Sequence, residues 1–219
     1  AWPKSLASLS KAKIKKPHEA RPHQRAAIKD VCAKLDGRGQ LIMACGTGKT
    51  LTGQRIAEKL ESETTLVLLP SLLLLSGTMN EWLQQTKVRF HYLPVCSDAS
   101  IGGKAAPETN FTSGELGNAS TTDPQEIRKF LRQKGNKVIF STYQSSGRVA
   151  DALKGTRIKF DLILADEAHR CAGKVAADYG YVLDEKKLPA KNRLFMTATP
   201  RIYKSNIKKA AKDADIQIA

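Results

Sequence analysis

Six short apolar runs alternate with segments of helical periodicity, and this alternation constrains the fold more than any other feature. The runs are short enough to be strands buried on both faces, and they cover residues 40–44, 65–69, 88–95, 137–143, 160–165 and 193–197. The helical segments cover residues 22–35, 49–60, 71–85, 124–133 and 148–154. Strands that alternate with helices predict an α/β domain with a mostly parallel sheet and helices on both faces.

The stretch MACGTGKT, residues 43–50, follows the first apolar run and opens a helical segment. Gly46 and Gly48 let backbone N–H groups point at an anion, and the helix adds the positive end of its dipole. Lys49 is placed to reach the β- and γ-phosphates of a nucleotide, and the Thr50 hydroxyl is placed to bind Mg²⁺. The alternative is a glycine-rich turn with a chance Gly-Lys-Thr.

Two adjacent acids, Asp166 and Glu167, follow the apolar run 160–165. They therefore lie at the carboxyl end of a buried strand, where open parallel sheets bind ligands. We expect Asp166 to hold Mg²⁺ and Glu167 to orient and deprotonate an attacking water. A solvated turn is the alternative, but the phosphate loop earlier in the chain makes it the weaker interpretation.

Another apolar run ends at Met196-Thr197-Ala198-Thr199-Pro200. The hydroxyls of Thr197 and Thr199 are candidates for hydrogen bonds to the acidic segment. Taken alone, these residues are ordinary strand formers before a proline.

Together the segments GTGKT, DEAH and TAT, in this order and spacing, resemble the first RecA-like domain of superfamily 2 helicases and translocases from about residue 20 onward. The resemblance implies a RecA-like phosphate-loop fold, ATP hydrolysis, and ATP and Mg²⁺ as cofactors. Met43 stands where a glycine begins the usual phosphate-loop pattern, and a non-glycine residue there is common in this family.

The resemblance also implies further nucleotide contacts. Arg21 and Gln24 are similar to the family's upstream glutamine motif, in which the glutamine reads the adenine edge. A polar residue in a first helical turn is the alternative for Gln24. The remaining contacts come from the phosphate loop itself, namely Cys45, Gly46, Thr47 and Gly48. The Cys45 thiol is either reactive at the helix N-terminus or, as we favour, a small filler that points into the fold.

Three other roles follow from the same resemblance. His169 resembles the residue that links the ATP site to the motif of Thr197 and Thr199. Pro70 and Ser71 resemble one motif that contacts the nucleic-acid backbone, and a second such motif includes Thr142. For these contact residues the alternative is helix capping or loop structure.

The stretches MACGTGKT, FSTYQSS, ADEAHR and RLFMTATPRIY are most similar to restriction-type translocases of types I and III. The last stretch is especially similar to the motor of single-chain type ISP enzymes. The resemblance implies a motor that moves on double-stranded DNA. Three alternatives stay open: a strand-separating DNA or RNA helicase, a non-catalytic nucleic-acid-binding module, and a small-molecule phosphate-loop kinase.

Charge and length set the expected organisation. Lysines and arginines number 36 against 21 acids, a net charge of +15 that favours a polyanionic partner. We expect a basic linker or arm at 1–17, the RecA-like domain at 18–203, and a helix or linker at 204–219. Residues 98–122 have the composition of a long surface loop.

The chain begins with Ala and ends 20 residues after Thr199, so we expect a fragment of a longer protein. Its second RecA-like domain and further domains would then lie elsewhere, and the fragment alone would have little activity. The longest apolar run, 66–75, is interrupted by Pro70 and Ser71, which argues against a membrane partner. No C-x-x-C pair occurs among the four cysteines, which favours reduced thiols in the cytoplasm.

Overall fold

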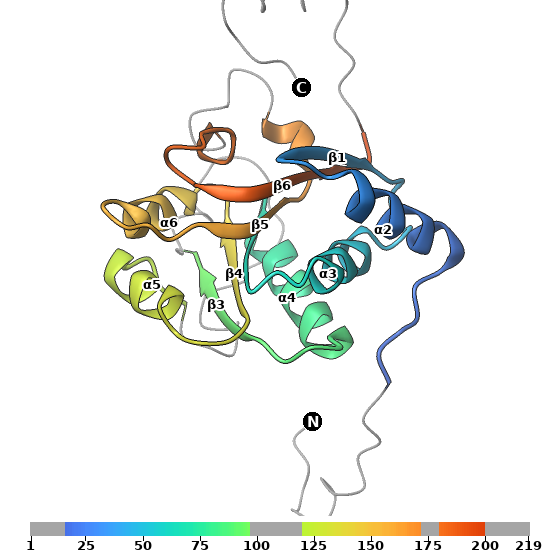
Figure 1. Ribbon diagram of the computed structural model, residues 1–219, viewed down its shortest axis with the longest axis horizontal. Coiled ribbons are helices and arrows are strands. Elements are labelled where there is room, and N and C mark those ends of the chain that lie inside the picture. Colours follow the sequence, from blue (N-terminus) through green and yellow to red (C-terminus); the bar gives the residue numbers. More distant parts are fainter. Residues whose placement is uncertain (1–15, 97–119, 172–179, 200–219) are drawn as a thin grey trace, which may run out of the picture.

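The computed structural model describes residues 16–96, 120–171 and 180–199, which form a six-stranded sheet with helices on both faces (Figure 1). Every strand pairing is parallel, and the strand order is β1-β6-β5-β2-β4-β3. The strands are β1 (Arg38–Ile42), β2 (Thr64–Leu69), β3 (His91–Val95), β4 (Lys137–Thr142), β5 (Phe160–Ala165) and β6 (Ala190–Thr197). The predicted α/β fold with a parallel sheet is confirmed.

Two groups of helices cover the sheet. One face carries α2 (Pro22–Lys34), α3 (Lys49–Lys59) and α4 (Leu72–Gln85), and the other carries α5 (Pro124–Leu131) and α6 (Ser146–Leu153) (Figure 1). Two short 3₁₀ helices, η3 (Ala168–Cys171) and η4 (Gly180–Leu183), follow β5 and precede β6. The described helices agree with the predicted helical segments to within two residues at each end.

Successive residues of the central strands enter two separate hydrophobic cores. In β2, Val67 and Leu69 pack with α2, α3 and α4, whereas Leu66 and Leu68 pack with α5 and α6. All four side chains are buried. Since side chains alternate across a strand, a strand covered on both faces has no side that faces solvent, which explains the apolar run from Leu66 to Leu69.

The two edge strands differ from their predicted extents. β3 begins at His91 and not at Val88, because its partner strand β4 begins opposite His91 at Lys137. Val88 therefore has no strand beside it and is 43% exposed. β1 begins two residues before the predicted run, at Arg38, because residue 38 pairs with Arg193 of β6.

Several predicted segments lie outside the described residues. These are most of the N-terminal arm, most of the loop at 98–122 and the C-terminal segment 204–219. Among the described helices, none is long and apolar enough to cross a membrane.

The carboxyl ends of the strands meet at one edge of the sheet, as they must when all strands are parallel. The phosphate loop follows β1, Asp166 follows β5, and Thr197 ends β6. Ser71 and Thr142 stand at the ends of β2 and β4, farther along the same edge. Each predicted site segment thus reaches this edge through a different strand.

Candidate functional site

The loop between β1 and α3 has the backbone of an anion cradle. Gly46 and Gly48 have φ angles of +75° and +83°, in the left-handed region that favours glycine. Gly48 is also the N-cap of α3, and no side chain caps this helix. The first N–H groups of a helix have no partner within the helix, so these donors and the dipole fit a phosphate group.

The side chain of Gln24, on α2, holds this loop from outside. Its Nε2 donates to the carbonyl oxygens of Thr47 at 3.0 Å and Gly48 at 3.3 Å. Its Oε1 accepts from the backbone N–H of Arg21 at 2.8 Å, and the side chain is buried. The sequence placed Gln24 near the nucleotide, but this support of the loop could not be predicted from it.

Lys49 lies between the loop and the acidic segment. Its Nζ is 3.9 Å from Glu167 Oε1 and donates to the carbonyl oxygen of Met43 at 3.5 Å. Both contacts are long for charge-assisted interactions. An ammonium group has three donors, so Lys49 retains capacity to bind an anion placed in the loop.

Asp166 is buried directly after β5, and its main chain is fixed. Its N–H donates to the carbonyl oxygen of Leu68 at 2.9 Å, and its own carbonyl oxygen accepts from the Tyr143 hydroxyl at 2.7 Å. Burial raises the pKa of Asp166, against the hydrogen bond that its Oδ1 accepts from the N–H of Glu167. A divalent cation would favour the charged form of this carboxylate, so Asp166 suits a Mg²⁺ ligand.

Glu167 adopts a left-handed backbone with a φ of +49°, which is unfavourable for a residue with a Cβ. This turn places its carboxylate between two cationic or titratable side chains. Oε1 faces Lys49, and Oε2 lies 3.2 Å from Nδ1 of His169. The strained residue is therefore the one predicted to activate water.

His169 connects the acidic segment to the end of β6. Its Nδ1 lies 3.1 Å from Oγ1 of Thr197 as well as near Glu167. The same Oγ1 accepts from the N–H of Thr199 at 3.2 Å. A continuous series of contacts thus runs from Lys49 through Glu167 and His169 to Thr197.

The predicted nucleic-acid residues have local structural roles in the described chain. Ser71 caps α4, because its side chain accepts from the N–H of Leu74 at 3.3 Å. Thr142 Oγ1 accepts from the N–H of Ser145 at 3.3 Å. These are the capping and loop roles that stood as the alternative, and Pro70 lies between β2 and Ser71.

Three residues of the phosphate loop differ in their surroundings. Cys45 is exposed, so our favoured interpretation of its thiol as a filler that points into the fold is wrong. The loop extends past the strand end into solvent, which leaves Cys45 uncovered. Thr47 donates its hydroxyl to the carbonyl oxygen of Ala44 at 2.6 Å, and Thr50 is half-buried in the first turn of α3.

An open pocket of about 410 Å³ lies beside the phosphate loop. Gly46, Gly48, Arg21 and Gln24 line it, together with His18, Glu19, Leu51 and Glu81. His18 and Glu81 were missed because they come from the segment before α2 and from the middle of α4. No spacing signal in the sequence connects either residue to the loop.

Comparison with known proteins agrees with this geometry. The model of the family "Type III restriction enzyme, res subunit" matches residues 17–202. Probable helicase A859L of African swine fever virus (isolate Tick/South Africa/Pretoriuskop Pr4/1996) is 33% identical over 169 residues. That alignment covers 77% of this chain and 18% of the viral protein.

Two solved structures of type ISP restriction-modification enzymes are similar over most of the chain. LlaBIII bound to DNA is 31% identical with a TM-score of 0.70, covering 86% of this chain and 13% of that one. A nuclease-deletion mutant of LlaGI in complex with a DNA substrate mimic is 33% identical with a TM-score of 0.68. That match covers 85% of this chain and 18% of the LlaGI chain. This chain therefore spans less than a fifth of the length of these relatives. It belongs to the family of the type III restriction enzyme res subunit, and it is a RecA-like domain of the superfamily 2 helicase type that resembles the motors of restriction enzymes.

Proposed function

We propose that this chain is the ATP-binding first motor domain of a DNA-dependent ATPase that moves along double-stranded DNA in a restriction-modification enzyme. The observation that carries the proposal is the series of contacts from Lys49 through Glu167 and His169 to Thr197. It joins the phosphate loop, the acidic segment and the end of β6. Such a connection lets events at the phosphates reach the strand end.

The residues take distinct roles in this proposal. The backbone of residues 45–48 holds the phosphates, and the ammonium group of Lys49 supplies positive charge beside the terminal phosphates. Thr50 and Asp166 hold Mg²⁺, which when bound neutralises charge on the phosphate oxygens. Glu167 orients the attacking water and takes its proton, while Arg21 and Gln24 form the base side of the pocket.

DNA contact is proposed for the other half of the same sheet edge. Ser71 and Thr142 lie at the ends of the neighbouring strands β2 and β4. The N-terminus of α4 and the Thr142 turn then face backbone phosphates, a sequence-independent contact. The net charge of +15 supports this partner, as does the DNA or DNA mimic bound in the two type ISP structures.

Hydrolysis in this proposal needs a second RecA-like domain. No arginine lies at hydrogen-bonding distance from Glu167 or Lys49 among the contacts of the described residues. Phosphoryl transfer commonly relies on an added cationic group to stabilise the transition state. We therefore expect weak ATP–Mg²⁺ binding and very slow turnover by the chain alone. A cytoplasmic location fits the thiols of Cys32 and Cys45, which form no disulfide among the described residues.

The test compares the 219-residue chain with the longer protein that contains it. Steady-state ATP hydrolysis is measured with and without duplex DNA. Slow turnover by the chain and DNA-stimulated turnover by the longer protein are expected. Robust DNA-stimulated turnover by the chain alone would refute the need for a second domain.

A second measurement separates movement from unwinding in the longer protein. Displacement of a triplex-forming strand reports movement along duplex DNA, whereas release of one duplex strand reports unwinding. We expect triplex displacement without strand release. The reverse result would support a strand-separating helicase instead.

A further inference from the structure

A second pocket, of about 240 Å³, lies at the opposite edge of the sheet from the phosphate loop. The C-terminal ends of α3 and α4 form two of its sides, with Ala57, Glu58 and Trp82. The first residues of β2 and β4, including Thr65 and Val138, form its floor. Small-molecule sites commonly measure about 300–1,000 Å³, so this pocket suits a single long side chain better than a nucleotide.

The walls combine apolar and aromatic surface with acids at the rim. Trp82 packs edge-on against Phe90 with ring centroids 6.3 Å apart, and both residues line the pocket beside Val88. Glu61 and Glu63 are exposed at the rim. Neither acid belongs to any ion pair among the described residues. The carboxyl end of α3 adds the negative end of its dipole, so the pocket attracts a cation.

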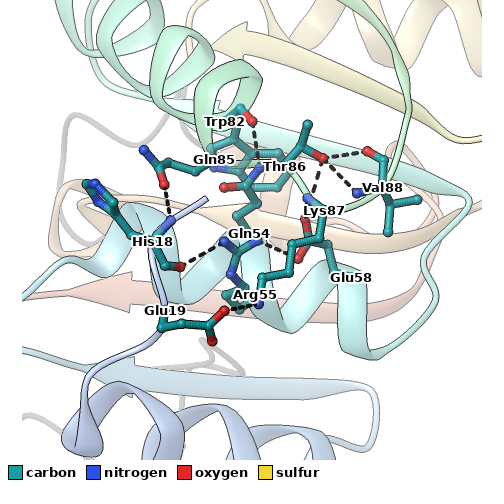
Figure 2. Close-up of polar contacts among 10 residues, drawn as sticks. All are labelled: His18, Glu19, Gln54, Arg55, Glu58, Trp82, Gln85, Thr86, Lys87 and Val88. Carbon is teal, nitrogen blue, oxygen red and sulfur yellow. Dashed lines mark hydrogen bonds and ion pairs between the residues drawn. The ribbon is translucent and has the colours of Figure 1, made fainter. Parts of the chain in front are cut away.

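Two deeply buried side chains in the pocket lining have polar atoms without a hydrogen-bond partner. Gln54 is 1% exposed, and its Nε2 donates to the carbonyl oxygen of Trp82 at 2.7 Å while its Oε1 has no partner (Figure 2). Trp82 is 3% exposed, and its indole Nε1–H also has no partner. Buried polar groups are nearly always paired. Both atoms have almost no accessible surface, so a ligand reaches the Gln54 acceptor or the Trp82 donor only if these side chains rotate toward the pocket.

Glu58 closes the side of the pocket nearest the segment before α2 and is already neutralised. Arg55 binds its Oε2 at 2.7 Å, and the backbone N–H of Lys87 donates to its Oε1 at 2.8 Å (Figure 2). Arg55 also donates to the carbonyl oxygen of His18, and Glu19 pairs with Lys87 at 3.0 Å. These contacts fix the wall, so the available negative charge is that of Glu61 and Glu63.

Glu61 occupies a backbone position that favours glycine. Its φ is +52°, at the turn where α3 ends, and the N–H of Ser62 returns to the carbonyl oxygen of Ala57 at 3.1 Å. Glycine is the usual residue at this position of such a helix end. The unfavourable conformation of Glu61 directs a carboxylate to the pocket rim at a cost in stability.

We propose that this pocket binds an arginine side chain presented by another domain of the longer protein. The guanidinium supplies planar donors for the rim carboxylates and, once the Gln54 amide rotates toward the pocket, for its Oε1. It also stacks on aromatic rings better than an ammonium does. The proposed function, in which this chain is one domain of a larger motor, is needed only to say where the arginine comes from.

The pocket lies on the helix that begins at the phosphate loop. Gln54, Ala57 and Glu58 stand about one and a half to two and a half turns along α3 from Lys49. A docked arginine therefore contacts the C-terminal half of α3, whereas the nucleotide of the proposed function contacts the N-terminus of the same helix.

The test uses the ¹⁵N-labelled 219-residue chain and acetyl-Gly-Arg-Gly-amide as the probe. The indole N–H of Trp82 is the reporter, and a Trp2→Phe variant assigns it, since the chain has two tryptophans. We expect a saturable shift of this signal with the arginine peptide. A peptide with citrulline, the neutral isostere, should not saturate, and a lysine peptide should bind several-fold more weakly.

Two variants locate the site without disturbing the fold. Glu61→Gly removes a carboxylate and relieves the left-handed backbone, so the chain stays folded while affinity for the arginine peptide falls about two- to fivefold. Adding Glu63→Gln should extend the loss to about tenfold. Glu126→Gln, on α5 across the sheet, is the matched control and should leave affinity unchanged.

Nucleotide binding is measured on the same samples, so that the two proposals fail separately. Absence of a saturable Trp82 shift, or equal binding of the arginine and citrulline peptides, overturns the arginine pocket whatever the nucleotide result. Loss of ATP binding with arginine binding intact overturns the proposed function alone.

Discussion

Gln24 and Gly48 are in such close contact that no side chain fits between them. A Cβ on Gly48 would lie 2.3 Å from Nε2 of Gln24, which donates to the Gly48 carbonyl oxygen. The contact ties α2 to the start of α3, so the shape of the phosphate loop depends on a residue 24 positions earlier.

Replacing Gly48 by alanine should therefore damage both stability and the loop. The left-handed φ of +83° alone costs about 1–2 kcal/mol for a residue with a Cβ, and displacing Gln24 adds to this. We expect a lower free energy of unfolding in urea and weaker binding of ATP–Mg²⁺. Gly77→Ala on α4 is the control, because a Cβ there meets no atom within 4 Å. That variant should be as stable as wild type or more so. Equal stability of G48A and wild type would contradict the close contact.

Replacing Lys49 by alanine should remove most of the affinity for ATP. Hydrogen bonds to charged groups contribute about 1.5–3 kcal/mol, which corresponds to about 10- to 100-fold in the dissociation constant. Titration with a fluorescent ATP analogue measures the change. Lys59→Ala, at the exposed C-terminal end of the same helix, should bind ATP like wild type. If K49A bound ATP as tightly as wild type, the phosphate-loop assignment would be wrong.

Asp166 should make the stability of the chain depend on pH. Folding raises the pKa of Asp166 through burial, so the folded state holds a proton more readily than the unfolded chain. Ionisation of Asp166 therefore lowers the free energy of unfolding. Below the ordinary carboxyl pKa the loss of stability is zero, and it increases as the pH rises toward the folded pKa. At neutral pH the loss is complete.

Asp166→Asn should accordingly unfold at higher urea concentration than wild type at pH 7, with a gain that shrinks as the pH falls from the folded pKa toward the ordinary carboxyl pKa and is absent below it. Asp30→Asn, exposed on α2, controls for the loss of one charge. Mg²⁺ with ATP should stabilise wild type and not D166N. A gain that grows toward acid pH would contradict the burial of a charged carboxylate.

The layered fold and the common edge of the site segments follow from the sequence for a physical reason. A strand covered by helices on both faces has a continuous apolar run, as in residues 66–69 and 162–165, and parallel strands bring their carboxyl ends together. Lys49, Asp166 and Thr197 could therefore be placed at one edge from their positions after such runs.

The side-chain contacts could not be placed in this way, because they depend on the strand order and on how loops pack. The neighbours of β5 are β2 and β6, and no pattern in the sequence states this order. Tyr143 reaches the Asp166 carbonyl oxygen, and His18 and Glu81 line the pocket beside the phosphate loop, only after the fold is assembled. The exposure of Cys45 likewise depends on how far the loop extends past β1.

His169 and Thr197 should be energetically coupled, since Nδ1 and Oγ1 lie 3.1 Å apart across the ends of β5 and β6. Their coupling is measured by a double-mutant cycle of His169→Ala and Thr197→Val in urea unfolding. A net hydrogen bond contributes about 0.5–1.5 kcal/mol, so the double variant should lose less stability than the two single variants summed, by about that amount. His91→Ala with T197V is the control, because His91 lies on β3 at the far edge of the sheet and should be additive within about 0.5 kcal/mol. Additivity of H169A and T197V would mean that the two strand ends are not joined through these side chains, and the proposed link between the acidic segment and β6 would then fail.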